Sequence, residues 1–189
     1  MSKQTDGSIL VELKQKLPNA QIWVPNDDDF EEQTRIYVKQ ANNITPLALV
    51  RPRSENEVAS VVEIAHKASV PLAIRVGGHD LVGRSRPDQA LILDLREFKD
   101  VEIVDEGQAA IIGGGILAQD LADALAKTGH ATTYGNSGTV GFAGWAVHGG
   151  YGPFMSAWGL GVDQILAARV VNYRGEIVDA DVELLFGLR

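Results

Sequence analysis

The sequence predicts an α+β protein with two lobes, each of them a small sheet with helices. From residue 46 onward, short apolar runs alternate with stretches of helical periodicity, which is typical of strands and helices packed in layers. Two glycine-rich stretches, one after residue 75 and one from 135 to 152, interrupt this pattern. The chain has 189 residues, 45% of them hydrophobic, so it can bury a real core.

Residues 1–43 are expected to form an N-terminal helical segment, because residues 9–17 and 30–38 are both amphipathic. An acidic cluster opens the second pattern, at Asp27, Asp28, Asp29, Glu31 and Glu32. Negative charge suits the exposed amides of a helix N-terminus, which favours a solvated helix start. A calcium loop needs oxygens at alternating positions and a glycine turn, and this pattern is absent here. No metal site is predicted.

The domain proper is expected at residues 44–183, with its first lobe at about 44–100. Residues 47–50 predict a strand that Pro52 ends. Ser54 and Glu57 have the spacing of a capping box, and a helix of about four turns should follow. Residues 71–76 predict a buried strand that runs into the first glycine stretch, and residues 91–95 predict another strand.

The second lobe, at about 101–183, begins with two strands predicted at residues 101–104 and 109–112. A helix should follow, with an apolar stripe and with Gly129 as its C-terminal stop. The stripe consists of Leu117, Leu121 and Leu125. Near the end of the lobe, Arg174-Gly175 predicts a tight turn between strands at residues 165–173 and 176–180.

Composition narrows the function classes. The net charge is -8, which disfavours nucleic acid as a partner, and no run approaches the roughly 18 apolar residues of a membrane span. The sequence has no cysteine, which excludes disulfides, thiolate metal sites and a cysteinyl cofactor bond. The N-terminus does not resemble a secretory signal, which favours a cytoplasmic location and leaves the compartment otherwise unknown.

The two glycine-rich stretches are the main candidates for ligand binding. Glycine allows backbone amides to approach a bulky anion, so such loops suit a pyrophosphate. Neither stretch has the lysine and hydroxyl ending of a nucleotide-hydrolase loop or the dinucleotide fingerprint that opens a helix. The alternative is that these glycines only make turns.

The order of several motifs resembles the PCMH-type FAD-binding domain of the vanillyl-alcohol-oxidase and berberine-bridge-enzyme superfamily. The resemblance extends from about residue 47 to the end of the chain. The matching pieces are Val50-Arg51-Pro52-x-Ser54, Arg75-x-Gly77-Gly78-His79, Leu93-Asp94-Leu95, Gly113-Gly114-Gly115, residues 135–141, Gly149-Gly150-Tyr151-Gly152, residues 159–163 and Gly175-x-Ile177-Val178-x-Ala180.

This resemblance implies a covalent bond between His79 and the methyl carbon of the isoalloxazine ring, for which the imidazole must act as a neutral nucleophile. Many relatives add a second bond through a cysteine, and the corresponding residue here is Ser137. A single covalent link is therefore the most that is expected. His66, His130 and His148 lack the Gly-Gly context and are expected to be surface or hydrogen-bonded residues.

The remaining FAD contacts are also implied by the resemblance. The backbone of the first loop should line the pyrophosphate, the second stretch should close over the cofactor, and a strand near residue 177 should face the pyrimidine side of the ring. Arg75 is equally compatible with a phosphate contact and with a salt bridge at the core edge. The residues so assigned are Val76, Gly77, Gly78, His79, Asp80, Ser137, Thr139, Val140, Gly141, Gly144, Gly149, Gly150, Tyr151, Ile177 and Val178. No catalytic residue is assigned.

The resemblance implies an oxidoreductase that oxidises a small organic substrate and passes electrons to dioxygen. In the family, the pattern at residues 184–189 is followed by a substrate domain, so that domain is expected to be absent from this chain and to come from a partner. The alternatives are a catalytically inactive FAD-binding fragment or a subunit of a split oxidase, and, in a different class, an interaction protein without flavin.

Overall fold

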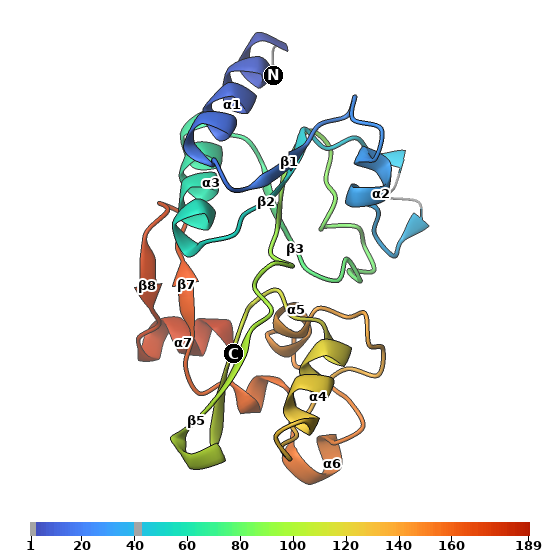
Figure 1. Cartoon of the computed structure of the whole chain (residues 1–189), viewed down its shortest axis with the longest axis vertical. Coiled ribbons are helices and arrows are strands. Elements are labelled where there is room, and N and C mark those ends of the chain that lie inside the picture. The colour runs from blue at the N-terminus through green and yellow to red at the C-terminus, as the bar shows by residue number, and fades with distance from the viewer. Residues whose placement is uncertain (1–2, 40–42) are drawn as a thin grey trace. The chain divides into compact units, whose positions relative to one another are not determined.

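The computed structural model describes residues 3–39 and 43–189, which form two compact units (Figure 1). The first unit comprises the chain up to Leu95 together with Arg169–Val178, and the second comprises Arg96–Ala168 and Asp179–Arg189. The N-terminal segment thus packs within the first unit. Residues 1–2 and 40–42 of the predicted segment 1–43 lie outside the described part of the chain. Both units combine small sheets with helices, as predicted.

The first unit contains a four-stranded sheet in the order β1-β2-β4-β3. Strand β1 is antiparallel to β2, and β2, β4 and β3 are mutually parallel. The strands are β1 (Gln21–Trp23), β2 (Ala48–Arg51), β3 (Leu72–Arg75) and β4 (Leu91–Asp94). The helices of this unit are α1 (Lys3–Lys16), α2 (Phe30–Thr34) and α3 (Glu55–Ala68). The strands predicted at 47–50, 71–76 and 91–95 are therefore confirmed.

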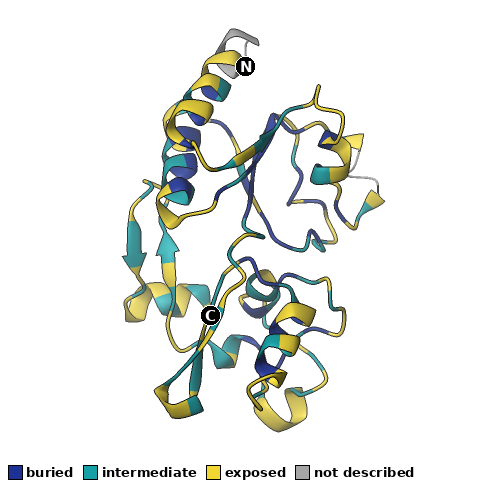
Figure 2. Ribbon diagram, in the orientation of Figure 1, coloured by how far each residue is buried: buried dark blue, intermediate teal, exposed yellow. Residues whose placement is uncertain are grey.

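Helices α1 and α3 lie against each other and share one apolar core with the sheet (Figure 1). Leu13 of α1, Val61 of α3 and Val50 of β2 all belong to this core and have no exposed surface. Strand residues alternate between faces, and Leu49 and Ile92 on the opposite face are also fully buried. Figure 2 shows β2 and β4 as the buried centre of this sheet.

Helix α3 begins as the capping-box spacing predicts, because the Ser54 hydroxyl accepts the Glu57 amide at 3.2 Å. The Glu57 carboxylate instead accepts the amides of Arg53 and Asn19, at 2.8 and 3.1 Å. At the other end Ser69 adopts the left-handed conformation with φ of 54°. A serine therefore ends this helix where glycine is the usual residue.

The prediction of a helix over residues 30–38 is wrong at its C-terminal end, since α2 ends at Thr34 and Arg35 is extended. The cause is a long-range contact: the guanidinium of Arg75 donates to the backbone oxygens of Gln33 and Arg35. Backbone oxygens engaged by this buried side chain favour an early end to the helix. Of the acidic cluster, the three aspartates precede α2 and the two glutamates lie in its first turn, where Glu31 forms an ion pair with buried Arg86 at 2.8 Å.

The second unit is built on a hairpin and a small core. Its strands are β5 (Val101–Val104) and β6 (Ala109–Ile112), with the bounds that the sequence predicts, and its helices are α4 (Ala118–Ala126), α5 (Phe142–Ala146), α6 (Met155–Trp158) and α7 (Val182–Leu188). Leu121 and Leu125 of α4 are buried as expected, together with Ile116, whereas Leu117 caps the helix and is only partly buried. Gly129, at φ of 76°, follows the last turn of α4 as predicted.

Strands β7 (Arg169–Val171) and β8 (Ile177–Asp179) form a separate two-stranded sheet. Gly175 makes the predicted turn with φ of 82°. The first of these strands begins at residue 169 rather than 165, and it packs against α3. The segment 169–178 therefore belongs to the first unit, although the sequence places it in the second lobe. None of the helices in the described residues is long and apolar enough to cross a membrane.

Candidate functional site

The loop at residues 76–80 follows β3 directly, and one of its glycines is required by the fold. Gly78 is buried, has φ of 66°, and accepts the amide of Tyr37 at 2.9 Å through its carbonyl. A Cβ at this position would lie 3.2 Å from Cγ2 of Ile36. The segment 36–37 therefore approaches the loop so closely that a side chain at Gly78 would be both strained and crowded.

His79 lies beside Tyr37, and the two rings are stacked with centroids 4.8 Å apart and planes inclined by 16°. Burial lowers the pKa of His79 below its usual value of 6.5. The imidazole is therefore predominantly neutral at neutral pH. Asp80 beside it binds Arg84: its Oδ1 accepts two guanidinium bonds at 3.0 and 3.1 Å. Burial raises the pKa of Asp80, but the bonds to Arg84 outweigh it and lower the pKa overall.

Arg75 lies in the core edge below this loop with only 5% of its surface exposed. Its Nη1 lies 3.4 Å from Oδ2 of Asp94, and Nη2 of Arg51 lies 3.1 Å from the same oxygen. Asp94 itself is fully buried. Of the two roles that the sequence leaves open for Arg75, the structure shows the salt bridge, and a phosphate contact stays a prediction.

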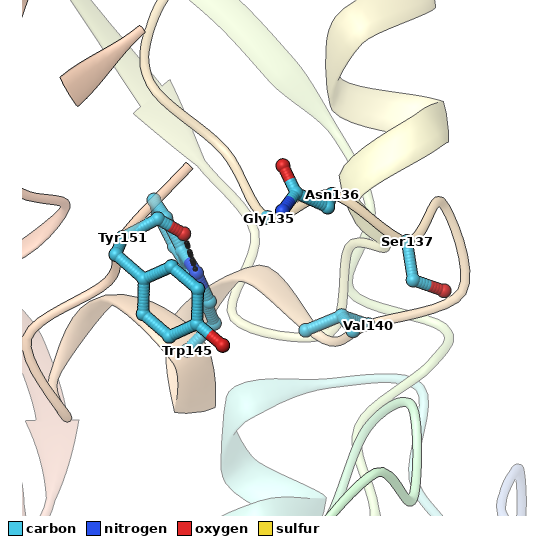
Figure 3. A pocket seen from close by; sticks show the side chains of 6 residues that line it. All are labelled: Gly135, Asn136, Ser137, Val140, Trp145 and Tyr151. Atoms are coloured by element: carbon cyan, nitrogen blue, oxygen red, sulfur yellow. Dashed lines mark hydrogen bonds between the residues drawn. The ribbon is translucent and has the colours of Figure 1, made fainter. Parts of the chain in front are cut away.

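The second glycine stretch surrounds a pocket of about 200 Å³ within the second unit (Figure 3). Its lining consists of Gly135, Asn136, Ser137, Val140, Trp145 and Tyr151. Ser137 is thus at the pocket wall, where its hydroxyl lies 3.2 Å from that of Thr139. The structure brings Ser137, Val140 and Tyr151 of the predicted site residues together in this pocket.

Trp145 organises this stretch and is a residue that the sequence interpretation missed. Its indole N–H donates to the carbonyl of Tyr151 at 2.9 Å, the bond drawn in Figure 3. A Cβ on Gly150 or Gly161 would lie 3.1 or 2.4 Å from the six-membered ring, and one on Gly135 would lie 3.2 Å from the indole nitrogen. A side chain at any of these three positions would therefore crowd the indole. The available signal was a single tryptophan embedded among glycines.

Gly144 and Gly149 differ from these, because a Cβ on either would meet no atom within 4 Å. Their backbone therefore remains open to a ligand on the side where a side chain would stand. Gly141 precedes α5 and makes an isolated bridge with Leu117, while the Val140 carbonyl accepts the Ala118 amide at 2.9 Å. These two predicted residues tie the glycine stretch to the start of α4.

The other predicted positions have defined surroundings. Ile177 and Val178 are half-buried on β8. His66 contacts Tyr173 edge to face, and Nδ1 of His130 and of His148 lies within 3.0 Å of a nearby oxygen, so all three match the expectation for ordinary histidines. In the part of the chain that the structure describes, no group of histidines and acidic residues could hold a metal ion.

Comparisons with known proteins identify the family to which this chain belongs. A family model described as FAD binding domain matches residues 46–181. FAD-linked oxidoreductase aurO of Gibberella zeae is 35% identical over 97% of this chain and 36% of its own length. BBE-like 1 from Physcomitrella patens has a TM-score of 0.88 and 30% identity over 94% of this chain and 40% of its own chain.

A third similar protein is glucooligosaccharide oxidase from Acremonium strictum, which carries a 6-S-cysteinyl, 8α-N1-histidyl FAD. It has a TM-score of 0.87 and 25% identity over 96% of this chain and 39% of its own. The chain thus spans less than half the length of each of these proteins. Because the family model covers most of the sequence, the chain belongs to the FAD-binding domains of the berberine-bridge-enzyme-like FAD-linked oxidoreductases.

Proposed function

We propose that this chain is the cofactor-holding part of an FAD-linked oxidase, that His79 alone forms the covalent bond to the flavin, and that dioxygen takes the electrons. The observation that carries the proposal is the His79 loop. A neutral imidazole follows a Gly-Gly pair whose backbone conformation and close packing favour glycine at position 78.

The residues present suit a flavin dinucleotide. A neutral imidazole has a nitrogen lone pair for bond formation, whereas an imidazolium has none. The loop amides at 76–80 offer donors for a pyrophosphate. In the second unit, the backbone at Gly144 and Gly149 is also open to a ligand. Glucooligosaccharide oxidase carries a histidyl and a cysteinyl link, but Ser137 cannot make the second.

A bound flavin would supply hydride acceptance and electron delivery to dioxygen. The groups described in this chain bind and orient that cofactor. A small organic substrate must also be docked against the ring, deprotonated and shielded from water. We assign these tasks to the remainder of a longer polypeptide or to a partner chain, because relatives are more than twice as long. An inactive FAD-binding fragment, or a subunit of a split oxidase, is the second candidate.

The test is the fate of bound flavin under acid. In the wild-type chain, yellow colour should stay with the acid precipitate, and phosphodiesterase treatment, which cleaves the pyrophosphate and releases AMP, should identify it as FAD. His79→Ala should still bind FAD but release it into the supernatant. His66→Ala is the matched control, since His66 lies on the exposed end of α3, and it should retain the colour. Release of all flavin from the wild type would refute the covalent link.

Activity separates the two candidates. Peroxide formation should be measured with panels of alcohols, sugars and amines, using the chain alone and in its longest natural context. We expect little or no turnover by the 189-residue chain alone. Robust turnover would show that these residues build a complete active site.

A further inference from the structure

The stack between Tyr37 and His79 has a geometry suited to a nucleophile. Both nitrogens of an imidazole present their lone pair or N–H in the ring plane, at the edge of the ring. Tyr37 contacts a face, since the planes are nearly parallel at 16°. Such a contact restricts the rotation of the imidazole while it engages neither nitrogen.

Tyr37 is itself held in place from the core. Its amide donates to Gly78, the second residue of the Gly-Gly pair. The backbone of the preceding residues is fixed by Arg75, which donates to the Arg35 carbonyl at 3.0 Å. Arg75 is in turn paired with the fully buried Asp94. A continuous set of contacts therefore runs from the buried carboxylate to the ring that lies on His79.

A role in core packing accounts poorly for this tyrosine, because 66% of its surface is exposed. An aromatic ring that serves stability is usually buried far more completely. The well-defined position of Tyr37 and its high exposure point instead to its effect on the neighbouring imidazole.

We propose that Tyr37 is a positioning residue for covalent flavin attachment, which holds the His79 imidazole by its face so that the ring edge is presented to the cofactor. This inference rests on the proposed histidyl link. The attachment would break one C–H bond of the flavin methyl group and form a bond from that carbon to a ring nitrogen of His79. The methyl carbon and the imidazole would each lose a proton, and the two electrons of the C–H bond would reduce the flavin. Dioxygen would then reoxidise the flavin and leave as hydrogen peroxide.

The experiment compares Tyr37→Leu with Tyr37→Phe in the flavin-free chain. Leucine keeps apolar bulk without a ring face, whereas phenylalanine keeps the face and removes only the hydroxyl. After addition of FAD, acid-stable flavin is measured over time, and non-covalent binding is measured separately in the His79→Ala background. Wild type and Tyr37→Phe should link flavin at the same rate, and Tyr37→Leu should be slower by about three- to tenfold, the population effect of losing one aromatic stack. Non-covalent affinity should not change.

A second readout needs no flavin. The carbon-bound ring protons of His79 should show an upfield ring-current shift in nuclear magnetic resonance spectra of wild type and Tyr37→Phe, and this shift should disappear in Tyr37→Leu. Tyr37→Trp should restore both the shift and the linking rate. Because Tyr37 is largely exposed, Tyr37→Leu should lower stability by no more than the worth of the stack, and Tyr37→Phe and Tyr37→Trp should match wild type in thermal unfolding.

The possible failures are distinguishable. Absence of acid-stable flavin in the wild type would overturn the histidyl link and this inference with it. A normal linking rate in Tyr37→Leu, with the wild type linked, would overturn only the positioning role. Parallel loss of FAD affinity and of linking rate would also overturn it, since Tyr37 would then be a binding contact. A wild-type spectrum without the ring-current shift would show that the stack is not formed.

Discussion

The two glycine-rich stretches look alike in the sequence but use glycine for different reasons. At Gly78 the requirement comes from a neighbouring backbone, since segment 36–37 packs on the loop that carries His79. Between residues 135 and 161 the requirement at Gly135 and Gly161 comes from a side chain, the indole of Trp145. A glycine count therefore indicates close approach, but it does not say whether a ligand, a backbone or a side chain approaches.

The largest loss of stability is expected from a change at Asp94, which lies next to the loop that carries His79. Asp94→Ala leaves Arg75 and Arg51 without the buried carboxylate that they share, and removal of one partner of a buried ion pair costs about 3–5 kcal/mol. Denaturant unfolding measures the loss, with the exposed Asp28→Ala as a control that should be neutral. Equal stability of both variants would mean that the ion pairs of Asp94 with Arg51 and Arg75 do not stabilise the folded chain.

Within the glycine-rich stretch 135–152, a substitution at Gly152 should lower stability the most. A Cβ there would lie 1.9 Å from the Tyr134 carbonyl oxygen, so Gly152→Ala must displace backbone and should cost on the order of 3 kcal/mol. Gly144→Ala is the matched control. It meets no atom within 4 Å and lies inside α5, so it should be neutral or slightly stabilising. Thermal unfolding of the two variants decides the matter.

Gly78→Ala should have a smaller effect on stability, about 1–2 kcal/mol, from its positive φ and the contact with Ile36. Gly149→Ala separates these causes, because Gly149 has φ of 98° but open space for a Cβ. Gly149→Ala should lose only the stability that an alanine loses at positive φ, without a steric contribution. If the two variants were equally stable, the approach of segment 36–37 would have no energetic weight.

The smallest effect is the pH dependence from His79. Its folded pKa lies below 6.5, so the unfolded chain binds a proton first as the pH falls below 6.5. Stability should therefore be level with respect to this group above 6.5 and should decline below it, until the folded imidazole is protonated as well. Unfolding of wild type and His79→Gln between pH 7.5 and 5 should show a steeper decline in the wild type. A flatter wild-type profile would mean that the folded pKa is not lowered.

The elements that the sequence predicted well depend on local patterns. The strands 101–104 and 109–112 and the N-cap at Ser54 follow from residues adjacent in the chain. The early end of α2 was missed because it depends on Arg75, which is distant in the sequence. No periodicity reveals such a contact.

In the candidate site, too, features within one motif were predicted and contacts between distant residues were missed. Resemblance identified the His79 loop as a unit, but the Tyr37 stack joins residues far apart in the sequence and belongs to no motif. The packing of Trp145 likewise depends on Gly161, which lies outside the glycine-rich stretch 135–152 and in a separate motif at residues 159–163. The FAD contacts assigned to individual residues stay predictions.

Trp145 has a consequence for spectroscopy. The chain has three tryptophans, Trp23, Trp145 and Trp158, and among them Trp145 lines the pocket of the second unit, whereas Trp23 lies over Arg51 in the first. Flavins absorb in the near ultraviolet where indoles emit, so a flavin that enters this pocket would quench the fluorescence of Trp145. Variants that retain only Trp145 or only Trp23 would then report cofactor arrival and the integrity of the first unit as two separate optical signals.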